Sequence, residues 1–144
     1  MKAVQNWAVP TNTREVESFL GFVNYHREHV PNFAQIAVCL YKLTGPKSKF
    51  VWENKHQEAF CNLKTVLVNA PVLGFPQDEG MYVLDCDASA TSIGAELSQL
   101  QDRKLRVLAY SSLSLSAAQR KYCTTRKELL AVVRFTHQYR HFLL

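Results

Sequence analysis

Apolar residues in the first half of the chain recur at three- and four-residue intervals, the spacing that places them on one side of a helix. Asn12 stands three residues before Glu15, which is the spacing of a capping box at a helix start. The pattern therefore predicts a first helix over about residues 13–27. Its apolar stripe consists of Val16, Phe19, Leu20 and Val23.

Two further helices are expected before residue 75. Pro31 suits the first turn of a helix, where a missing N–H is not needed, and Gly45-Pro46 is typical of a helix end. A third helix should follow the turn at residues 47–49 and end at Pro71. The second stripe consists of Phe33, Ile36, Ala37, Leu40 and Leu43, and the third of Ala59, Phe60, Leu63, Val66 and Leu67. Three short helices in succession predict a small bundle.

The pattern becomes strand-like after a stretch rich in proline, glycine and aspartate at residues 74–80. Residues 81–87, 92–98 and 106–112 are typical of β-strands separated by turn or charged residues. From Thr124 onward the composition predicts a helix that packs on the sheet. The expected contact stripe consists of Leu129, Val132, Val133 and Tyr139.

These elements predict an α+β fold with a domain boundary near Phe75. A small helical unit should occupy residues 1–74, and a truncated mixed sheet with one packed helix should occupy residues 75–144. Three strands and one helix leave one face and one edge of the sheet uncovered. We therefore expect the second domain to be incomplete and to self-associate through the exposed sheet edge.

Composition narrows the class of protein. Of the 144 residues, 47% are hydrophobic and 20% are charged, as in globular proteins. No apolar run approaches the roughly 20 residues that span a bilayer, and no secretory signal opens the chain. We therefore expect a soluble intracellular protein of the cytoplasm or nucleus. The net charge of +5 is compatible with a nucleic-acid partner.

Asp87 and Glu128 are the candidate metal ligands. Asp87 ends a predicted strand and Glu128 lies early in the last predicted helix, and carboxylates that converge from different elements suit a hard cation such as Mg²⁺. Each carboxylate also has a purely structural alternative: Asp87 could cap a turn, and Thr125 with Glu128 has the spacing of a capping box. Asp85 shares a strand face with Asp87 and is either a third ligand or a solvated carboxylate.

Basic and aromatic residues of the helical half are candidates for nucleic-acid contacts. The basic residues could line a phosphate track or simply form a solvated surface. The aromatic residues could stack on bases, although packing inside a bundle is their more frequent use. The basic residues are Arg14, Arg27, Lys47 and Lys49, with Lys42 beside them, and the aromatic residues are Trp7, Phe22, Tyr25 and Trp52.

Four stretches resemble consecutive parts of the polymerase polyprotein of gypsy-class LTR retrotransposons and retrovirus-like elements. They are VPTNTREVESFLGFVNYHREHVPNFAQIAVCLYKLTG, FVWENKHQEAFCNLKTVLVNAPVLGFP, LDCDASATSIGAELSQ and LAYSSLSLSAAQRKYCTTRKELLAVVRFTHQYRHFLL. The stretches follow the family's order and cover nearly the whole chain. The resemblance implies that the first two belong to the thumb region of a reverse transcriptase, which holds the template-primer duplex. The last two would begin a ribonuclease H domain.

The resemblance also implies roles for individual residues. Asp87 and Glu128 match the family's first and second ribonuclease H carboxylates, which ligate Mg²⁺ or Mn²⁺ beside the scissile phosphate of the RNA strand in an RNA–DNA hybrid. Ser89 and the Ser98-Gln99 pair match positions near the site, and we assign them at most backbone contacts. The family's remaining two carboxylates and the polymerase Tyr-x-Asp-Asp motif have no counterpart in the sequence.

We therefore expect a fragment of a retroelement reverse transcriptase and ribonuclease H, whose partners are the hybrid or duplex and the remainder of the polyprotein. Two carboxylates cannot reproduce a site of four, so we expect the isolated chain to have little or no nuclease activity. The alternative is a noncatalytic remnant that binds nucleic acid or another protein.

Overall fold

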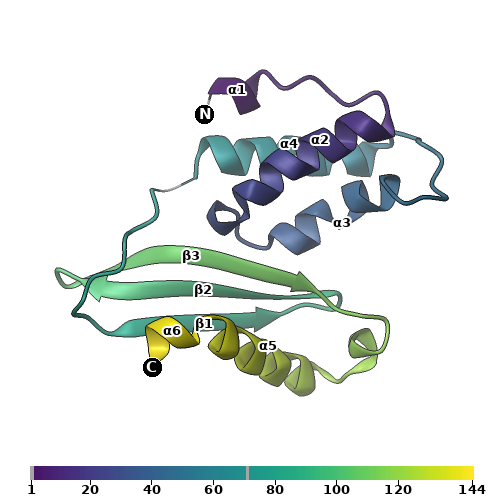
Figure 1. The fold of residues 1–144 in the computed structure, drawn as a ribbon. Helices are drawn as coiled ribbons and strands as arrows, with labels where there is room; N and C mark the ends of the chain where they lie inside the picture. Colours follow the sequence, from purple (N-terminus) through teal and green to yellow (C-terminus); the bar gives the residue numbers. More distant parts are fainter. Residues whose placement is uncertain (1, 71) are drawn as a thin grey trace.

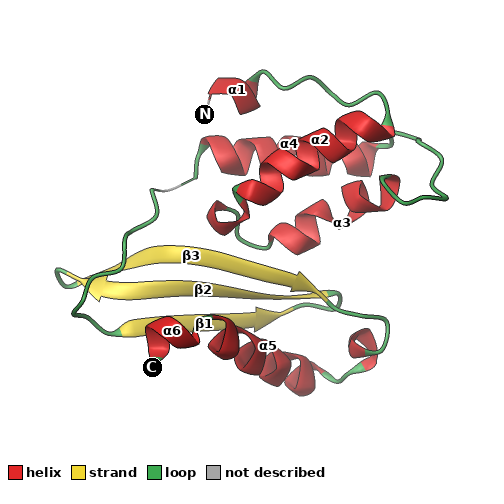
Figure 2. Cartoon of the chain, in the orientation of Figure 1, coloured by secondary structure: helices red, strands yellow, loops and turns green. Residues whose placement is uncertain are grey.

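The computed structural model describes residues 2–70 and 72–144, in which a helical unit lies on one side of a three-stranded sheet and a helix lies on the other (Figure 1). Figure 2 shows that helices come first, then strands, then helices, so the expected α+β class is confirmed. None of the helices in this described part has the length and apolar character needed to cross a membrane. The elements are α1 (Lys2–Gln5), α2 (Thr13–Tyr25), η1 (Arg27–His29), α3 (Phe33–Leu43), α4 (Asn54–Val68), β1 (Tyr82–Ala88), β2 (Ser92–Gln101), β3 (Lys104–Ser114), η2 (Gln119–Lys121), α5 (Thr124–Gln138) and α6 (Arg140–Leu143), where η marks a 3-10 helix.

The helical unit is organised around one buried apolar cluster that α1 to α4 share. Phe19 and Phe60 are among its largest members, and their ring centroids lie 4.7 Å apart. Three of the four candidate stacking residues (Trp7, Phe22 and Trp52) pack partly buried against this cluster, whereas Tyr25 is 85% exposed. The cluster consists of Val4, Val16, Phe19, Leu20, Val23, Val30, Phe33, Ala37, Leu40, Leu43, Ala59, Phe60, Leu63 and Leu67. It contains most of the three predicted stripes, which are thereby confirmed.

The residues at which the helices begin are determined by local hydrogen bonds and backbone conformation more than by the spacing of apolar residues. Asn12 Oδ1 accepts the N–H of Glu15 at 3.0 Å, as the capping spacing predicts. The Glu15 carboxylate reaches one residue further back and accepts the N–H of Thr11 at 2.8 Å, and these bonds from Thr11 lower the pKa of Glu15. The second helix begins at Phe33 and not at Pro31, because Asn32 adopts left-handed backbone with φ of 55°. The third helix ends at Val68, and Pro71 lies outside the described residues.

The sheet has the order β1-β2-β3, and both pairings are antiparallel. The parallel pairing that a mixed sheet needs is not found among the strands of residues 2–70 and 72–144. A two-residue turn joins β2 to β3: Asp102 and Arg103 have φ of 50° and 63°, the left-handed backbone that a tight hairpin requires. Within the described chain no strand pairs with the outer edge of β1.

The packed stripe of α5 differs from the predicted one. Leu129, Val132 and Val133 are 60%, 47% and 67% exposed, so that part of the prediction is wrong, and only Tyr139 of the predicted set is buried. The helix instead packs through Ala131, Phe135 and Tyr139. The physical reason is that α5 carries apolar residues on two sides, and only the contact with the sheet decides which side is buried. The sheet residues of this second cluster include Leu84, Cys86, Ala88, Ile93, Ala95 and Leu97.

The segment that leads into the sheet is held by a buried glutamine. Gln99 is 0% exposed; its Oε1 accepts the N–H of Gln77 at 2.9 Å and its Nε2 donates to the Gln77 carbonyl at 2.9 Å. Gln101 adds a bond from its Nε2 to the Phe75 carbonyl at 2.8 Å. These bonds satisfy both the buried amides and the backbone of an irregular segment. Gln99 therefore makes the backbone contacts expected for the Ser98-Gln99 pair.

The helical unit meets the sheet at Ser112 of β3. The Ser112 carbonyl accepts Arg27 Nη2 at 2.7 Å, and its hydroxyl oxygen accepts the N–H of Ala34 at 2.9 Å. Ser112 is 3% exposed, so both bonds are shielded from water. The second face of the sheet, which was expected to be uncovered, is thus partly covered by η1 and the start of α3 over β3.

We predict that Gln99→Leu destabilises the sheet domain by about 1–3 kcal/mol, because it removes the hydrogen bonds by which the buried Gln99 amide holds the N–H and carbonyl of Gln77. Urea denaturation followed by circular dichroism measures the change. Gln35→Leu, at an exposed position on α3, is the matched control and should change the free energy of unfolding by much less. Equal losses in the two variants would contradict this role of Gln99.

We also predict that Ser112→Ala loosens the docking of α3. The Ala34 amide loses its acceptor, and a net loss of about 0.5–1.5 kcal/mol corresponds to roughly two- to tenfold faster hydrogen exchange at Ala34. Exchange followed by NMR gives the rate for this one amide. Ser114→Ala, an exposed serine two residues further along β3, should leave it unchanged, and the same acceleration in both variants would argue against the contact.

Candidate functional site

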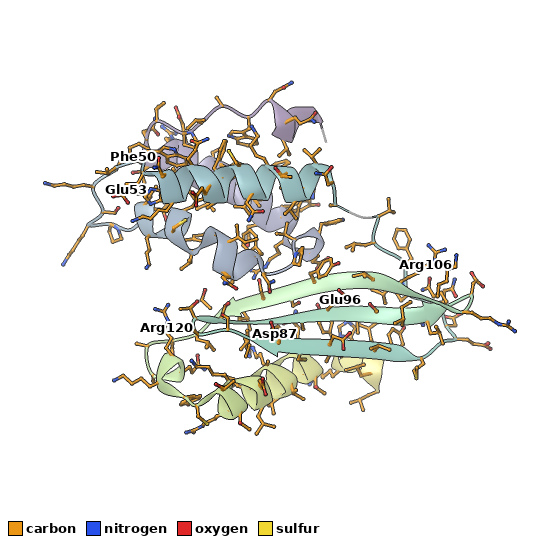
Figure 3. All side chains as sticks on the ribbon, turned by 180° about the vertical axis from the view of Figure 1, so that it is seen from behind. Phe50, Glu53, Asp87, Glu96, Arg106 and Arg120 are labelled. Carbon is orange, nitrogen blue, oxygen red and sulfur yellow. The ribbon has the colours of Figure 1, made fainter. Side chains whose placement is uncertain are left out.

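Asp87 lies near the end of β1, on the sheet face opposite α5 (Figure 3). Strand alternation explains this placement: Leu84, Cys86 and Ala88 point into the cluster that packs on α5, so Asp85 and Asp87 point the other way. The Asp87 side chain is exposed and makes no hydrogen bond or ion pair within the described chain. The alternative in which Asp87 caps a turn therefore has no hydrogen bond to support it.

The helical unit borders the face that carries Asp87. Asp87 pairs with Gly94 across the β-ladder, and the Asn32 Oδ1 atom lies 3.1 Å from the position that a Cβ atom on Gly94 would occupy. A cavity of about 180 Å³ opens between the two units. Its polar lining includes Asn32, Asp85, Asp87, Glu96 and Tyr110. The absence of a side chain at position 94 therefore allows the helical unit to come close to β2 beside Asp87.

Glu128 lies near the start of α5 and is exposed. The helix begins at Thr124, its N-cap residue is Cys123, and no side chain caps it. The capping-box interpretation of Thr125 with Glu128 is therefore wrong, because Thr125 is already inside the helix. Glu128 stands three and seven residues before Ala131 and Phe135, so it continues the sheet-facing side of α5 by one turn.

Asp87 and Glu128 lie at the same end of the sheet domain. Lys127 Nζ, from the residue next to Glu128, donates to the Ala90 carbonyl at 3.2 Å, and Ala90 lies in the turn that directly follows β1. Ser89 closes this turn, because its Oγ accepts the N–H of Ser92 at 3.0 Å. Asp87 and Glu128 thus lie at the same end of the sheet domain, but Asp87 is on the sheet face opposite α5 and Glu128 is on α5 itself. The hydroxyl of Ser89 is used within the turn.

Asp85 and Glu96 add negative charge to the Asp87 face. They are direct cross-strand partners, and like charges in such a pair repel each other. Ser98 Oγ donates to Glu96 Oε1 at 3.0 Å, and burial together with the nearby Glu96 carboxylate raises the pKa of Tyr110. No group of three Asp, Glu, His or Cys side chains that could hold a metal occurs within residues 2–70 and 72–144. Strand alternation could have placed Glu96 here, had the β1–β2 register been known.

The basic residues proposed for phosphate contacts have different surroundings. Arg14, Lys47 and Lys49 are exposed. Arg27 is half-buried: besides Ser112, it bonds Asn24 Oδ1 at 3.3 Å, and its guanidinium carbon lies 5.1 Å from the centroid of the Phe33 ring. The structure thus gives Arg27 a role in holding the two units together.

Comparison with known proteins shows the family to which the chain belongs. A model described as an RNase H-like domain found in reverse transcriptase matches residues 52–144. The retrovirus-related Pol polyprotein from transposon 297 of Drosophila melanogaster is 34% identical, with coverage of 100% of this chain and 13% of that protein. The transposon Tf2-3 polyprotein of Schizosaccharomyces pombe is 35% identical, with coverage of 97% of this chain and 11% of that protein. The chain thus spans about an eighth of the length of these relatives.

Solved structures support the fold. The foamy viral protease-reverse transcriptase dRH in complex with double-stranded DNA matches with a TM-score of 0.83 and 23% identity, covering 97% of this chain and 25% of the other. The foamy viral protease-reverse transcriptase in complex with an RNA/DNA hybrid matches with a TM-score of 0.78 and 24% identity, covering 96% and 19%. At these identities the likeness concerns the fold alone. The family match covers more than half of the chain and agrees with the motif resemblance, so the chain belongs to the RNase H-like domains found in reverse transcriptases.

Proposed function

We propose that the chain joins the end of a reverse transcriptase thumb, residues 1–74, to the first part of a ribonuclease H domain, residues 75–144. Two separate buried clusters support this division, one in the helical unit and one between the sheet and α5. The Gly74 N–H donates to the Val107 carbonyl at 2.8 Å, so the chain is already bonded to the sheet from this residue onward. The family match starts earlier, at residue 52, although α4 packs with the helical unit.

Within the whole polyprotein, the proposed activity is hydrolysis of the RNA strand of RNA–DNA hybrids beside RNA-directed DNA synthesis. The observation that carries this proposal is the pair of exposed carboxylates, Asp87 and Glu128, that lie at the same end of the sheet domain and have no partner within the described residues. Exposed carboxylates that are free of caps and ion pairs are available to a ligand. The partners we propose are the hybrid or template-primer duplex and the remaining polyprotein, with self-association through the free edge of β1.

The donor chemistry of this pair fits Mg²⁺ or Mn²⁺. Carboxylate oxygens are the ligands that hard divalent cations prefer, and both side chains are open to solvent. When bound, two such cations activate a water and stabilise the leaving oxygen of a phosphodiester. Asp87 and Glu128 would each supply oxygen ligands. Since the described chain offers no third ligand beside them, we infer that carboxylates from elsewhere in the polyprotein complete the set.

We predict that Asp87→Asn and Glu128→Gln each lower ribonuclease H activity of the polyprotein's reverse transcriptase by about a hundredfold or more, because each removes a metal-binding charge and keeps the side-chain shape. Cleavage of an end-labelled RNA–DNA hybrid in Mg²⁺, and again in Mn²⁺, measures this. Asp85→Asn, two residues from Asp87 on the same strand face, is the matched control and should retain most of the activity. Full activity in the Asp87→Asn enzyme would refute the assignment.

The isolated chain should cleave the same hybrid at no more than background rate in either metal, because only part of the ligand set is present. Cleavage by the purified chain that disappears in Asp87→Asn would instead show that a second copy or an unassigned residue completes the site.

A further inference from the structure

The side chain of Asn32, at the start of α3, has a position that its local structure does not explain. Asn32 is the N-cap residue of this helix. Asparagine is among the residues most favoured there, because its side-chain oxygen accepts a backbone N–H of the first helical turn. Asn32 makes no such bond, and within residues 2–70 and 72–144 its amide has no hydrogen-bond partner. The amide is therefore free to contact something else.

Ser112 of the sheet makes the bond that a capping asparagine ordinarily makes. Its hydroxyl accepts the N–H of Ala34, the second residue of α3. The start of α2 shows the ordinary arrangement, in which the side chain of the N-cap residue Asn12 accepts the N–H of Glu15. Asn32 also has left-handed backbone with φ of 55°, and residues with such uncommon backbone are frequent near functional sites. Both features point to a role for Asn32 outside its own helix.

The free amide lies on the wall of the cavity that contains Asp87. This cavity of about 180 Å³ has Asn32 and Asp87 in its lining. Asn32 Oδ1 lies 3.1 Å from the position of a Cβ atom on Gly94, which is the direct cross-strand partner of Asp87. The Cβ positions of direct partners are about 4.5–5.5 Å apart. The amide is thus beside Asp87 in the row of the sheet that Asp87 and Gly94 share.

The remaining distance suits a water molecule on a cation. Mg²⁺ binds oxygen ligands at about 2.0–2.1 Å, and a hydrogen bond from a bound water to an oxygen acceptor spans about 2.8 Å. A cation can therefore lie roughly 5 Å from the Asn32 oxygen and still share a water with it. Since the Asp87 carboxylate extends from the neighbouring position of the same row, a cation that it held would come within this range.

We propose that Asn32 is a positioning residue of the nuclease, whose amide oxygen accepts a hydrogen bond from a water on the divalent cation held by Asp87. Mg²⁺ keeps several waters when it binds to proteins, and groups around a metal site that bond its ligands fix their orientation. Through Asn32 the helical unit takes part in the metal site of the sheet domain. This inference rests on the proposed nuclease function, because it needs a cation at Asp87.

The proximity of Asn32 to the cation can be tested without any cleavage, by adding Mn²⁺ to the isotope-labelled 144-residue chain. Mn²⁺ is paramagnetic and broadens the NMR signals of nuclei close to it. The side-chain amide of Asn32 and the backbone amide of Asp87 should broaden over the same range of Mn²⁺ concentration, and Asp87→Asn should abolish both effects. An Asn32 amide that stays sharp would overturn the proposal.

The contribution of the amide to metal binding is measured by Asn32→Gly, which removes the side chain and still permits left-handed backbone. Mn²⁺ should bind about tenfold more weakly, as is common when a group that orients a metal ligand is lost. Asn32→Asp keeps an oxygen acceptor and should retain at least the original affinity. An unchanged rate of hydrogen exchange at Ala34 establishes that α3 remains docked in each variant.

The matched control is Asn69→Gly, at the exposed C-cap of α4. It also replaces a helix-end asparagine by glycine, and Asn69 does not line the cavity that contains Asp87. The affinity for Mn²⁺ should stay at the original value. Equal weakening in the two glycine variants, or no weakening in Asn32→Gly, would refute the role of Asn32.

Cleavage by the polyprotein's reverse transcriptase separates this inference from the nuclease assignment. Asn32→Gly should raise the Mg²⁺ concentration needed for half-maximal cleavage of the hybrid, and excess Mg²⁺ should restore much of the rate. If the Mg²⁺ requirement is unchanged while Asp87→Asn abolishes cleavage, the role of Asn32 is refuted and the nuclease stands. If Mn²⁺ broadens both amides but cleavage does not depend on Asp87, the shared cation stands and the nuclease assignment fails.

Discussion

Two hydrogen bonds at Ser112 determine how the helical unit and the sheet are arranged. The carbonyl of this one strand residue accepts Arg27 from η1, and its hydroxyl accepts the Ala34 N–H at the start of α3. The first bond has a charged donor, and such bonds are stronger than neutral ones. Between the two donors the chain turns through the left-handed Asn32 and comes down onto β2 above Gly94. The face that carries Asp87 is therefore a cavity between two units and not an open sheet face.

This docking also explains why position 94 is a glycine. The backbone there is ordinary strand, so conformational freedom is not the reason. A side chain would instead meet Asn32 Oδ1 at 3.1 Å, closer than most carbon contacts in proteins. Because Gly94 has no side chain, the helical unit can approach β2. The same absence leaves space beside Asp87, the cross-strand partner of Gly94.

The sequence could predict the buried face of a helix where its apolar residues form a single stripe, because only one orientation of the helix then buries them. The apolar residues of α2 form a single stripe, so the buried face followed from spacing alone. In α5, Leu129, Val132 and Val133 lie on one side and Ala131 and Phe135 on another, and spacing cannot tell which side meets the sheet.

The candidate site, too, could be predicted from the sequence only in part. Asp87 and Glu128 were found from their chemistry and from motif resemblance, but two kinds of information were missing. The capping-box alternative for Glu128 depended on whether α5 begins at Thr124 or two residues later, at Arg126, which is within the usual uncertainty of helix ends. The contribution of Glu96 depended on the register that pairs it with Asp85. Register and helix ends follow from tertiary contacts, which a single sequence does not display.

Charge is the remaining constraint on any function at this end of the sheet. Asp85, Asp87 and Glu96 share one face, and Asp85 lies directly across from Glu96, so the face repels phosphate groups as it stands. A phosphodiester can approach only if positive charge offsets that repulsion. Metal ions would do so at contact distance, where the carboxylates hold them. In the proposed arrangement the carboxylates therefore have two tasks: they would hold the cations that offset the repulsion, and through these cations they would supply the activated water that attacks the phosphodiester.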